Sequence, residues 1–498
     1  MRVGVRSILG FGLAAAVLAG VVTGCGGSSN ERAATPRWCP SVEGHAVDCG
    51  VIQRPLIEGR AELGTVDIGY ARIKHTTEGA AAGTILPNPG GPGVPMIGHA
   101  PEAAKLAAAM LDRYDVLLID PRGTGVSSPI DCGVGADEYQ LGTREEQRQA
   151  VARCARQLGA KAQGYTSAAT VDDFDAVRAH LGIDKVIPYG ISYGTYLMPI
   201  YAQRHPERVQ SMVLTGAYPH DTDQLQRPNA QAVSLALQRI CERSQVCDGN
   251  TAVNDLSAVA TRLRDKPLTV QGKGQLLLTE SKLASLVFEA ATSNVGADPR
   301  AMTPLGMLPA ALHAAVRGDD TRLIEFTRLT TDEPAYENIG LYITVVCNDY
   351  APIWSPEADL PQREQQYRDA LAQADGFGAF SAQGFAGGQR DGGDACINWS
   401  ADKDHQRPDQ VHTPMPDVPV LVLSGDLDAI TPDANGKRVA AKFAHATFLS
   451  VPNTGHVPDL EPSGCVIGII DHFVRTGIAA ATDCVAAIPP IAVAPVTN

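Results

Sequence analysis

The sequence GISYG at residues 190–194 places Ser192 between two glycines. A serine hydroxyl becomes an effective nucleophile only when it is exposed at a sharp turn and held against a base. The apolar run at 185–189 predicts a strand before this turn, and residues 193–204 predict a helix after it. That strand-turn-helix context is typical of a nucleophile elbow. Ser192 is therefore the candidate nucleophile, and the amide of Tyr193 is a candidate donor to an oxyanion.

A nucleophile of this kind requires an acid and then a histidine later in the chain. The sequence GDLD at 425–428 follows a predicted strand and offers Asp428, with Asp426 as a rival, while His456 follows the next strand at a glycine turn. Each motif alone is equally typical of an ordinary turn. Their order, each after its own strand, favours a triad in which His456 moves the proton and Asp428 orients the imidazole.

A glycine-rich loop, NPGGPG at 88–93, follows another short predicted strand. Glycines allow the backbone to approach a substrate oxygen, so Gly91, and after it Gly90, are candidates for the second oxyanion donor. No Gly-Lys-Ser/Thr follows the loop, which argues against a phosphate-binding loop.

Two further polar motifs are interpreted as structural. The sequence DPRGTG at 120–125 is interpreted as a turn bordering the site, in which Arg122 pairs locally. A helix is predicted to start at Thr170 as its N-cap, with Asp173 in the position of a capping-box acid.

Strands and helices alternate along much of the chain. Buried strands are predicted at 114–120, 185–189 and 209–214, and the pattern returns at 418–423 and 446–451. Continuous apolar strands alternating with helices indicate an α/β fold with a mostly parallel, doubly wound sheet. Because open α/β sheets gather their sites at the carboxyl ends of the strands, this sheet would bring the three candidate side chains together.

The strand pattern fades between 221 and 412, where helical patterns such as 230–243 dominate. The simplest interpretation is one α/β core, residues 51–220 and 413–498, interrupted by a mainly helical cap insertion at 221–412. The insertion has the size of a domain.

The N-terminus has the pattern of an export signal. Basic residues at 1–6 precede an apolar run at 8–22, and small residues lead to Cys25. We predict a lipoprotein signal peptide at 1–24, a diacylated Cys25 that holds the protein on a membrane, and a linker within 25–50. A cleaved signal with an incidental cysteine, or a short membrane anchor, is the alternative. The net charge of −14 argues against a nucleic-acid partner.

Ten of the eleven cysteines remain when Cys25 is set aside. An even number in an oxidising compartment indicates disulfides, although sequence leaves their connectivity open. Zinc or redox chemistry has little support, since no Cys-x-x-Cys occurs, and no metal or organic cofactor is implied. Sequential pairing is the working hypothesis: Cys39–Cys49, Cys132–Cys154, Cys241–Cys247, Cys347–Cys396 and Cys465–Cys484.

Taken together, the motifs resemble those of the actinobacterial exported tripeptidyl aminopeptidases, α/β-hydrolases related to prolyl iminopeptidases. The resemblance implies the α/β-hydrolase fold with a helical cap, the triad Ser192, Asp428 and His456, and hydrolysis of peptides from a free N-terminus. The matching segments occur in family order over nearly all of the mature chain: 88–93, 120–125, 190–194, 347–349, 396–399, 425–428 and 455–456.

The chain departs from the family at residues 214–220, LTGAYPH, where members often carry an acidic run. An aminopeptidase needs carboxylates that pair with the substrate ammonium. Asp349, Glu333 and Glu337 are candidates, with a solvated surface role as the alternative for each. The rival functions are a carboxylesterase or lipase with the same triad, and a binding lipoprotein that has lost its chemistry.

Overall fold

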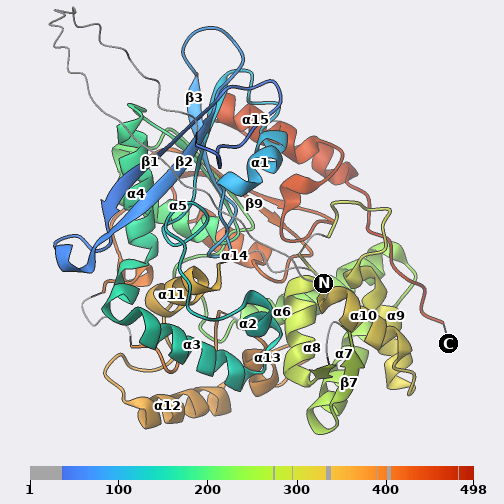
Figure 1. Ribbon diagram of the computed structural model, residues 1–498. Coiled ribbons are helices and arrows are strands. Elements are labelled where there is room, and N and C mark those ends of the chain that lie inside the picture. Colours follow the sequence, from blue (N-terminus) through green and yellow to red (C-terminus); the bar gives the residue numbers. More distant parts are fainter. Residues whose placement is uncertain are drawn as a thin grey trace, which may run out of the picture. The chain divides into compact units, whose positions relative to one another are not determined.

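An eight-stranded sheet forms the centre of the fold, with strand order β1-β2-β4-β3-β5-β6-β9-β10 (Figure 1). The pairs β1–β2 and β2–β4 are antiparallel, and all pairs from β4 to β10 are parallel, which confirms the mostly parallel sheet. The strands are β1 (Val47–Pro55), β2 (Thr65–Ile73), β3 (Gly83–Asn88), β4 (Tyr114–Ile119), β5 (Ile187–Ile191), β6 (Met212–Thr215), β9 (Pro419–Gly425) and β10 (His445–Val451).

These observations come from a computed structural model that describes residues 36–272, 275–293, 295–331, 338–389, 391–400, 405–479 and 482–497. The predicted signal peptide, Cys25, Glu333 and Glu337 lie outside the described residues. Within these ranges, no helix is both long and apolar enough to cross a bilayer.

Helices cover both faces of the sheet. One face packs against α1 (Ala100–Leu106) and α15 (Cys465–Thr476), and the other against α4 (Ser167–His180), α5 (Gly194–Arg204) and α14 (Asp433–Ala440). On β9, Leu421 and Leu423 join the first cluster, whereas Val420 and Val422 join the second. Burial on both faces explains why this strand is a continuous apolar run in the sequence.

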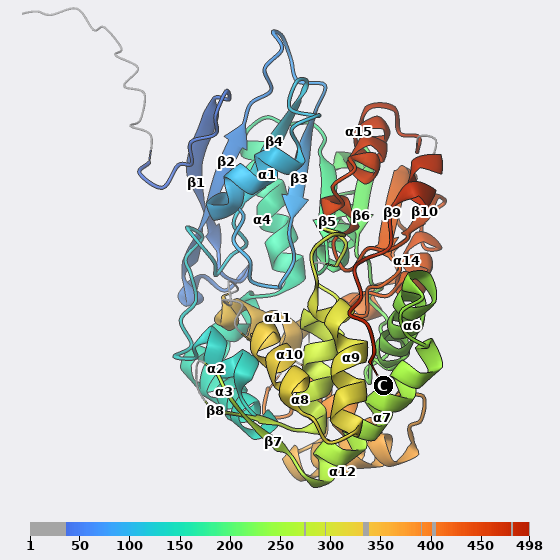
Figure 2. The ribbon, with the colours of Figure 1, turned by 90° about the vertical axis from the view of Figure 1, so that its right-hand side faces the viewer.

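The segment of the chain that connects β6 to β9 forms a mainly helical cap, which lies at one end of the sheet (Figure 2). Most of its helices share a hydrophobic core separate from the two that flank the sheet, whereas the helix at 339–349 packs into one of those two. The cap comprises α6 (Arg227–Ser244), α7 (Gly249–Asp265), the hairpin β7 (Leu268–Gln271) and β8 (Gln275–Leu278), α8 (Glu280–Ser285), a π-helical turn (Leu286–Ala290), α9 (Pro304–Val316), α10 (Thr321–Thr331), α11 (Ile339–Asp349), α12 (Leu360–Gln373) and α13 (Ala382–Gly388).

A second insertion, which the sequence did not indicate, joins the cap from between β4 and β5. It contains α2 (Ala136–Leu141) and α3 (Arg144–Leu158). Arg144 donates to the Ala386 carbonyl oxygen at 2.9 Å, and Arg148 pairs with Glu364 of α12 at 3.0 Å. The cap is therefore built from two separate stretches of the chain.

All five predicted disulfides are present, which confirms the sequential pairing. The Cys39–Cys49 bond ties the segment before β1 to that strand. Residues 36–50, which we expected to be linker, therefore already belong to the folded unit.

The start of α4 differs from the prediction. Its N-cap is Thr166, whose hydroxyl accepts a hydrogen bond from the backbone amide of Ala169 in the first turn. Thr170 lies inside the helix. Asp173 is not a capping acid but is fully buried against Arg122, at 2.7 Å, and Arg54. Arg122 thus makes a long-range pair across 51 residues, which local sequence patterns do not reveal.

Candidate active site

Ser192 lies at the turn between β5 and α5, with a φ of 56°. Such a left-handed conformation is strained for a residue with a side chain and is typical of a nucleophile elbow. The flanking glycines are required by space, because a Cβ on Gly190 would lie 2.4 Å from the Gly194 oxygen and one on Gly194 2.3 Å from the Asn88 oxygen. The elbow that the GISYG motif predicts is therefore formed.

Asp428 and His456 meet at the ends of β9 and β10. The Nδ1 atom of His456 lies 3.0 Å from Oδ2 of Asp428. Thr431 donates its hydroxyl to the same carboxylate oxygen at 2.5 Å and lies 3.0 Å from His456 Nδ1. Since a carboxylate only accepts, Nδ1 carries the proton of the neutral imidazole, which leaves Nε2 free to act as a base.

The rival acid, Asp426, is committed elsewhere. Its carboxylate pairs with Arg243 of the cap at 2.5 Å and accepts the backbone amide of Asn453 at 2.8 Å. The structure thus assigns the histidine's partner to Asp428.

The cap also holds the histidine loop in place. The backbone amide of His456 donates to the Thr292 carbonyl oxygen at 3.0 Å. The backbone amide of Gly455 donates to the Val295 carbonyl oxygen at 2.7 Å. On the core side, a Cβ on Gly216 would lie 2.7 Å from the His456 carbonyl oxygen. The backbone of His456 is therefore held between the sheet and the cap.

A cavity of about 340 Å³ lies between the sheet and the cap. Ser192 and His456 both line it, together with Thr431 of the acid loop and Gly91 of the glycine-rich loop. This is the size of a small-molecule site. Two of the three candidate triad residues, Ser192 and His456, thus line one cavity, and the third, Asp428, contacts the histidine from outside the lining.

The glycine-rich loop approaches the nucleophile closely. A Cβ on Gly90 would lie 2.9 Å from both the Ser192 Cβ and the Tyr193 amide nitrogen. The Gly90 amide already donates to the Asn88 side chain at 3.1 Å. In the described part of the chain, the amides of Gly91 and Tyr193 have no such acceptor, so these two stay the candidates for oxyanion donors.

Comparison with known protein families agrees with this geometry. Residues 83–271 match the family model described as alpha/beta hydrolase fold, and residues 383–486 match the one described as TAP-like protein. This protein has the α/β-hydrolase fold and is a hydrolytic enzyme.

Relatives of this hydrolase include the hydrolase YuaR of Escherichia coli, 25% identical over 86% of each chain. The serine protease Hip1 of Mycobacterium tuberculosis is 32% identical over 44% of this chain and 47% of Hip1. The tripeptidyl aminopeptidase of Streptomyces lividans is 28% identical over 34% of this chain and 35% of that enzyme. The match thus spans about half of the length of Hip1 and about a third of the length of the tripeptidyl aminopeptidase. Among solved structures, the proline iminopeptidase of Mycobacterium smegmatis has 16% identity and a TM-score of 0.41, over 86% of this chain and 98% of that one.

Asp120 of the hydrolase, which the sequence placed in a structural turn, holds the segment that directly follows the glycine-rich loop. Its buried carboxylate accepts the backbone amides of Met96 at 2.7 Å, Ile97 at 2.8 Å and Val126 at 2.8 Å. Burial raises the pKa of this carboxyl, and the three amide bonds oppose that shift. Because these contacts join three loops, only the folded chain reveals the role.

Sequence reasoning did not identify the acidic residues on the walls of the hydrolase cavity. These residues are Asp137, Asp223, Glu289 and Asp391. No local pattern marks them, since each belongs to a different helix or loop and they meet only through the packing of the two insertions.

Asp349, by contrast, does not line this cavity. Its carboxylate is fully buried, where it accepts from Ser167 and His405. The structure thus gives Asp349 internal partners in place of the substrate ammonium that the sequence suggested.

Proposed function

We propose that this hydrolase is a serine peptidase that removes short peptides from the free N-terminus of its substrates. Ser192 Oγ attacks the carbonyl carbon, and His456 Nε2 takes the hydroxyl proton and delivers it to the leaving amine. Water then attacks the acyl-enzyme with His456 as the base. The amides of Gly91 and Tyr193 would stabilise the oxyanion in both steps.

The observation that carries the proposal is the presence of carboxylates on the walls of the cavity that Ser192 also lines. A free N-terminus presents an ammonium, and a hydrogen bond from an ammonium to a carboxylate is roughly twice as strong as one between neutral groups. Asp391 is half-buried and accepts the side-chain amide of Gln226 at 2.9 Å. A neutral amide leaves its negative charge available for an ammonium.

Two tyrosines complete the surroundings of Asp391. The hydroxyls of Tyr218 and Tyr350 are hydrogen-bonded to each other, and both residues line the cavity. Burial raises the pKa of both phenols, and the nearby charge of Asp391 raises it further, although the hydrogen bond from Tyr350 opposes the shift at Tyr218. Both phenols therefore stay neutral. Neutral phenols are hydrogen-bonding partners for an ammonium, and their ring faces attract cations.

Asp223 is the second candidate acceptor. It pairs with the half-buried Arg227 at 2.6 Å and accepts the amide of Leu225 at 2.9 Å. Because Arg227 already neutralises part of its charge, we assign the main role to Asp391.

The test compares a tripeptide chromogen with its N-acetylated form in wild type and Asp391→Asn. Hydrogen bonds to charged groups contribute about 1.5–3 kcal/mol, so the variant should lose about 10- to 100-fold in kcat/KM on the free peptide. Turnover of the blocked peptide should stay the same. Asp417→Asn, whose carboxylate is exposed and paired with His445, is the matched control and should resemble wild type.

Three results would count against the proposal. Equal turnover of free and blocked peptides by the wild type would exclude N-terminal trimming. Turnover of a p-nitrophenyl ester with no turnover of peptides would indicate a carboxylesterase. Failure of Ser192 to react with a fluorophosphonate would indicate a binding protein.

We further propose that the protein is exported and held on the membrane by a lipid on Cys25. The five disulfides support export, because such bonds are typical of oxidising compartments. The anchor itself rests on the sequence pattern that ends at Cys25.

A further inference from the structure

The CND and CINW motifs, which contain Cys347 and Cys396, have no part in the triad, yet they meet behind the elbow. The two cysteines form a disulfide. The Asn348 side chain accepts the Trp399 indole proton at 2.9 Å and donates to the Ala162 carbonyl oxygen at 3.0 Å. These bonds fix the carboxyl end of α11, a cap helix, against the core.

Asp349 is the last residue of α11, and its side chain is fully buried. One carboxylate oxygen accepts both the amide and the hydroxyl of Ser167 at 2.6 Å, and the other lies 2.8 Å from His405 Nε2. Ser167 is the first residue of α4, where the helix dipole stabilises a negative group. The carboxylate therefore joins a cap helix to the start of a core helix.

The hydrogen bonds continue from Ser167 to the elbow. The Ser167 hydroxyl lies 2.7 Å from the hydroxyl of Tyr193, the residue directly after the nucleophile. A serine hydroxyl has one proton, and Ser167 gives it to Asp349. Tyr193 must therefore donate to Ser167. The hydrogen bonds thus run in one direction, from Tyr193 through Ser167 to Asp349. Burial, and then the charge of Asp349, hold the pKa of Tyr193 well above its usual range, so its phenol keeps this proton.

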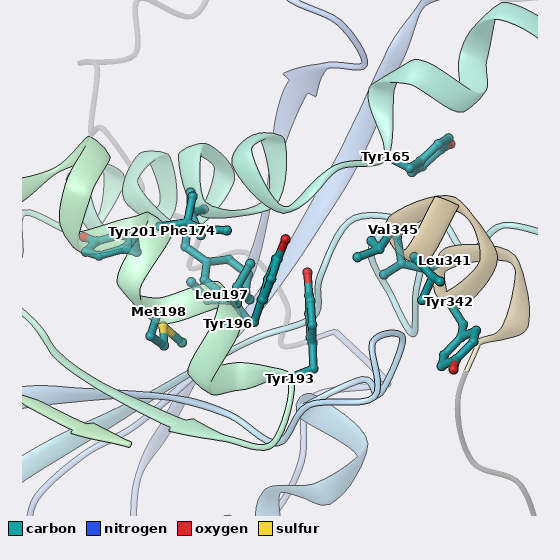
Figure 3. Close-up of a cluster of buried hydrophobic side chains, with 14 of the residues drawn as sticks. Tyr165, Phe174, Tyr193, Tyr196, Leu197, Met198, Tyr201, Leu341, Tyr342 and Val345 are labelled. Carbon is teal, nitrogen blue, oxygen red and sulfur yellow. The ribbon is translucent and has the colours of Figure 1, made fainter. Parts of the chain in front are cut away.

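A second tyrosine, Tyr196 in the first turn of α5, is tied to the same cap residue. Tyr196 donates its hydroxyl to the Asp349 carbonyl oxygen at 3.1 Å. Its ring stacks on that of Tyr193, with centroids 6.0 Å apart. Figure 3 shows the two rings side by side, with both hydroxyl oxygens at the same end. Asp349 thus holds both phenols at the start of the elbow helix.

We propose that Asp349 is a positioning residue for the oxyanion hole. Through Ser167 it fixes the side chain of Tyr193, and the amide of that same residue is an oxyanion donor. Such donors accelerate the reaction only when they are already aligned with the developing charge. Because Asp349 belongs to the cap, the seating of the cap is coupled to the alignment of the donor.

This inference rests on Ser192 as the nucleophile but not on the choice of substrate, since a peptide and an ester form the same oxyanion. The test measures kcat and KM on a p-nitrophenyl ester for Ser167→Ala, Tyr193→Phe and Asp349→Asn. A small misplacement of a catalytic group costs rate rather than ground-state binding. We expect kcat to fall about tenfold in each variant, with KM within about twofold of wild type.

The matched control is Tyr201→Phe. Tyr201 is also a fully buried tyrosine of α5, and it also donates to α4, to Asp175 at 3.0 Å, but it lies at the far end of the helix. We expect this variant to lose thermal stability to a similar extent while its kcat stays at the wild-type value.

Coupling between the substitutions separates positioning from a general loss of packing. If Ser167 and Tyr193 act in one chain, the double variant should be no slower than the slower single variant. The inference is overturned if Tyr193→Phe keeps the kcat of the control, or if the two losses multiply. A wild type that reacts neither with the ester nor with a fluorophosphonate would overturn both this inference and the assignment of Ser192. A wild type that hydrolyses esters but no peptides would overturn only the proposed peptidase function.

Discussion

Replacing Gly90 with alanine tests the close approach of the glycine-rich loop to the nucleophile. Gly90 has a φ of 101°, and an added Cβ would lie 2.8 Å from the Ile191 carbonyl oxygen and 2.9 Å from the Tyr193 amide nitrogen. Ordinary contact begins at 3.4 Å, so the loop or the elbow must move by about 0.6 Å. Neither neighbour is a flexible side-chain end, and the backbone conformation itself costs about 1–3 kcal/mol for a residue with a Cβ.

That displacement falls on the atoms that define the oxyanion hole. We expect Gly90→Ala to lose about 100-fold in kcat/KM, because a misplaced donor no longer meets the developing charge. The assay combines ester hydrolysis with the rate of fluorophosphonate labelling, and circular dichroism confirms that the variant is folded. Gly98→Ala is the control, since nothing lies within 4 Å of its added Cβ. A folded Gly90→Ala variant as active as the control would refute the argument.

Two other predictions concern the acid loop and a buried histidine. Asp428→Asn should lower kcat by about 10⁴-fold, since the amide cannot hold the imidazole tautomer. Asp426→Asn should instead lower the melting temperature, because it loses the pair with Arg243, and should leave kcat unchanged. Comparable kcat values in the two variants would contradict the assignment. Burial lowers the pKa of His220, which contacts the Tyr196 carbonyl oxygen at 2.9 Å, from 6.5 to about 4. The neutral form is the one the fold prefers, so stability is fully present above pH 6.5 and should decline by up to about 3 kcal/mol as the pH falls towards 4. Denaturant unfolding between pH 8 and 4 measures this decline, which His220→Gln should reduce; an equal decline in the variant would show that other groups cause it.

Much of the core could be predicted because its signals are local. A buried parallel strand is a continuous apolar run, and an elbow needs two glycines at fixed distances from Ser192. The disulfides also followed sequential pairing, the longest of them joining Cys347 to Cys396, 49 residues apart. For the strands and the elbow, the atoms that determine the feature are close together along the chain.

The polar contacts between distant segments could not be predicted in this way. Asp426 and Asp428 follow the same strand in the sequence, and the pairing of Asp426 with Arg243 of the cap separates it from Asp428, which contacts His456. Asp349 has the residue type of an ammonium ligand, yet its burial against Ser167 directs it to the elbow.

The sequence alone singled out the candidate side chains for the chemistry, because a strained turn and a buried strand impose their own residue types. The tertiary structure decided which acid serves the histidine, which carboxylates face the cavity and which are buried behind the elbow. Those choices depend on the distance between charges, and a linear pattern does not carry that distance.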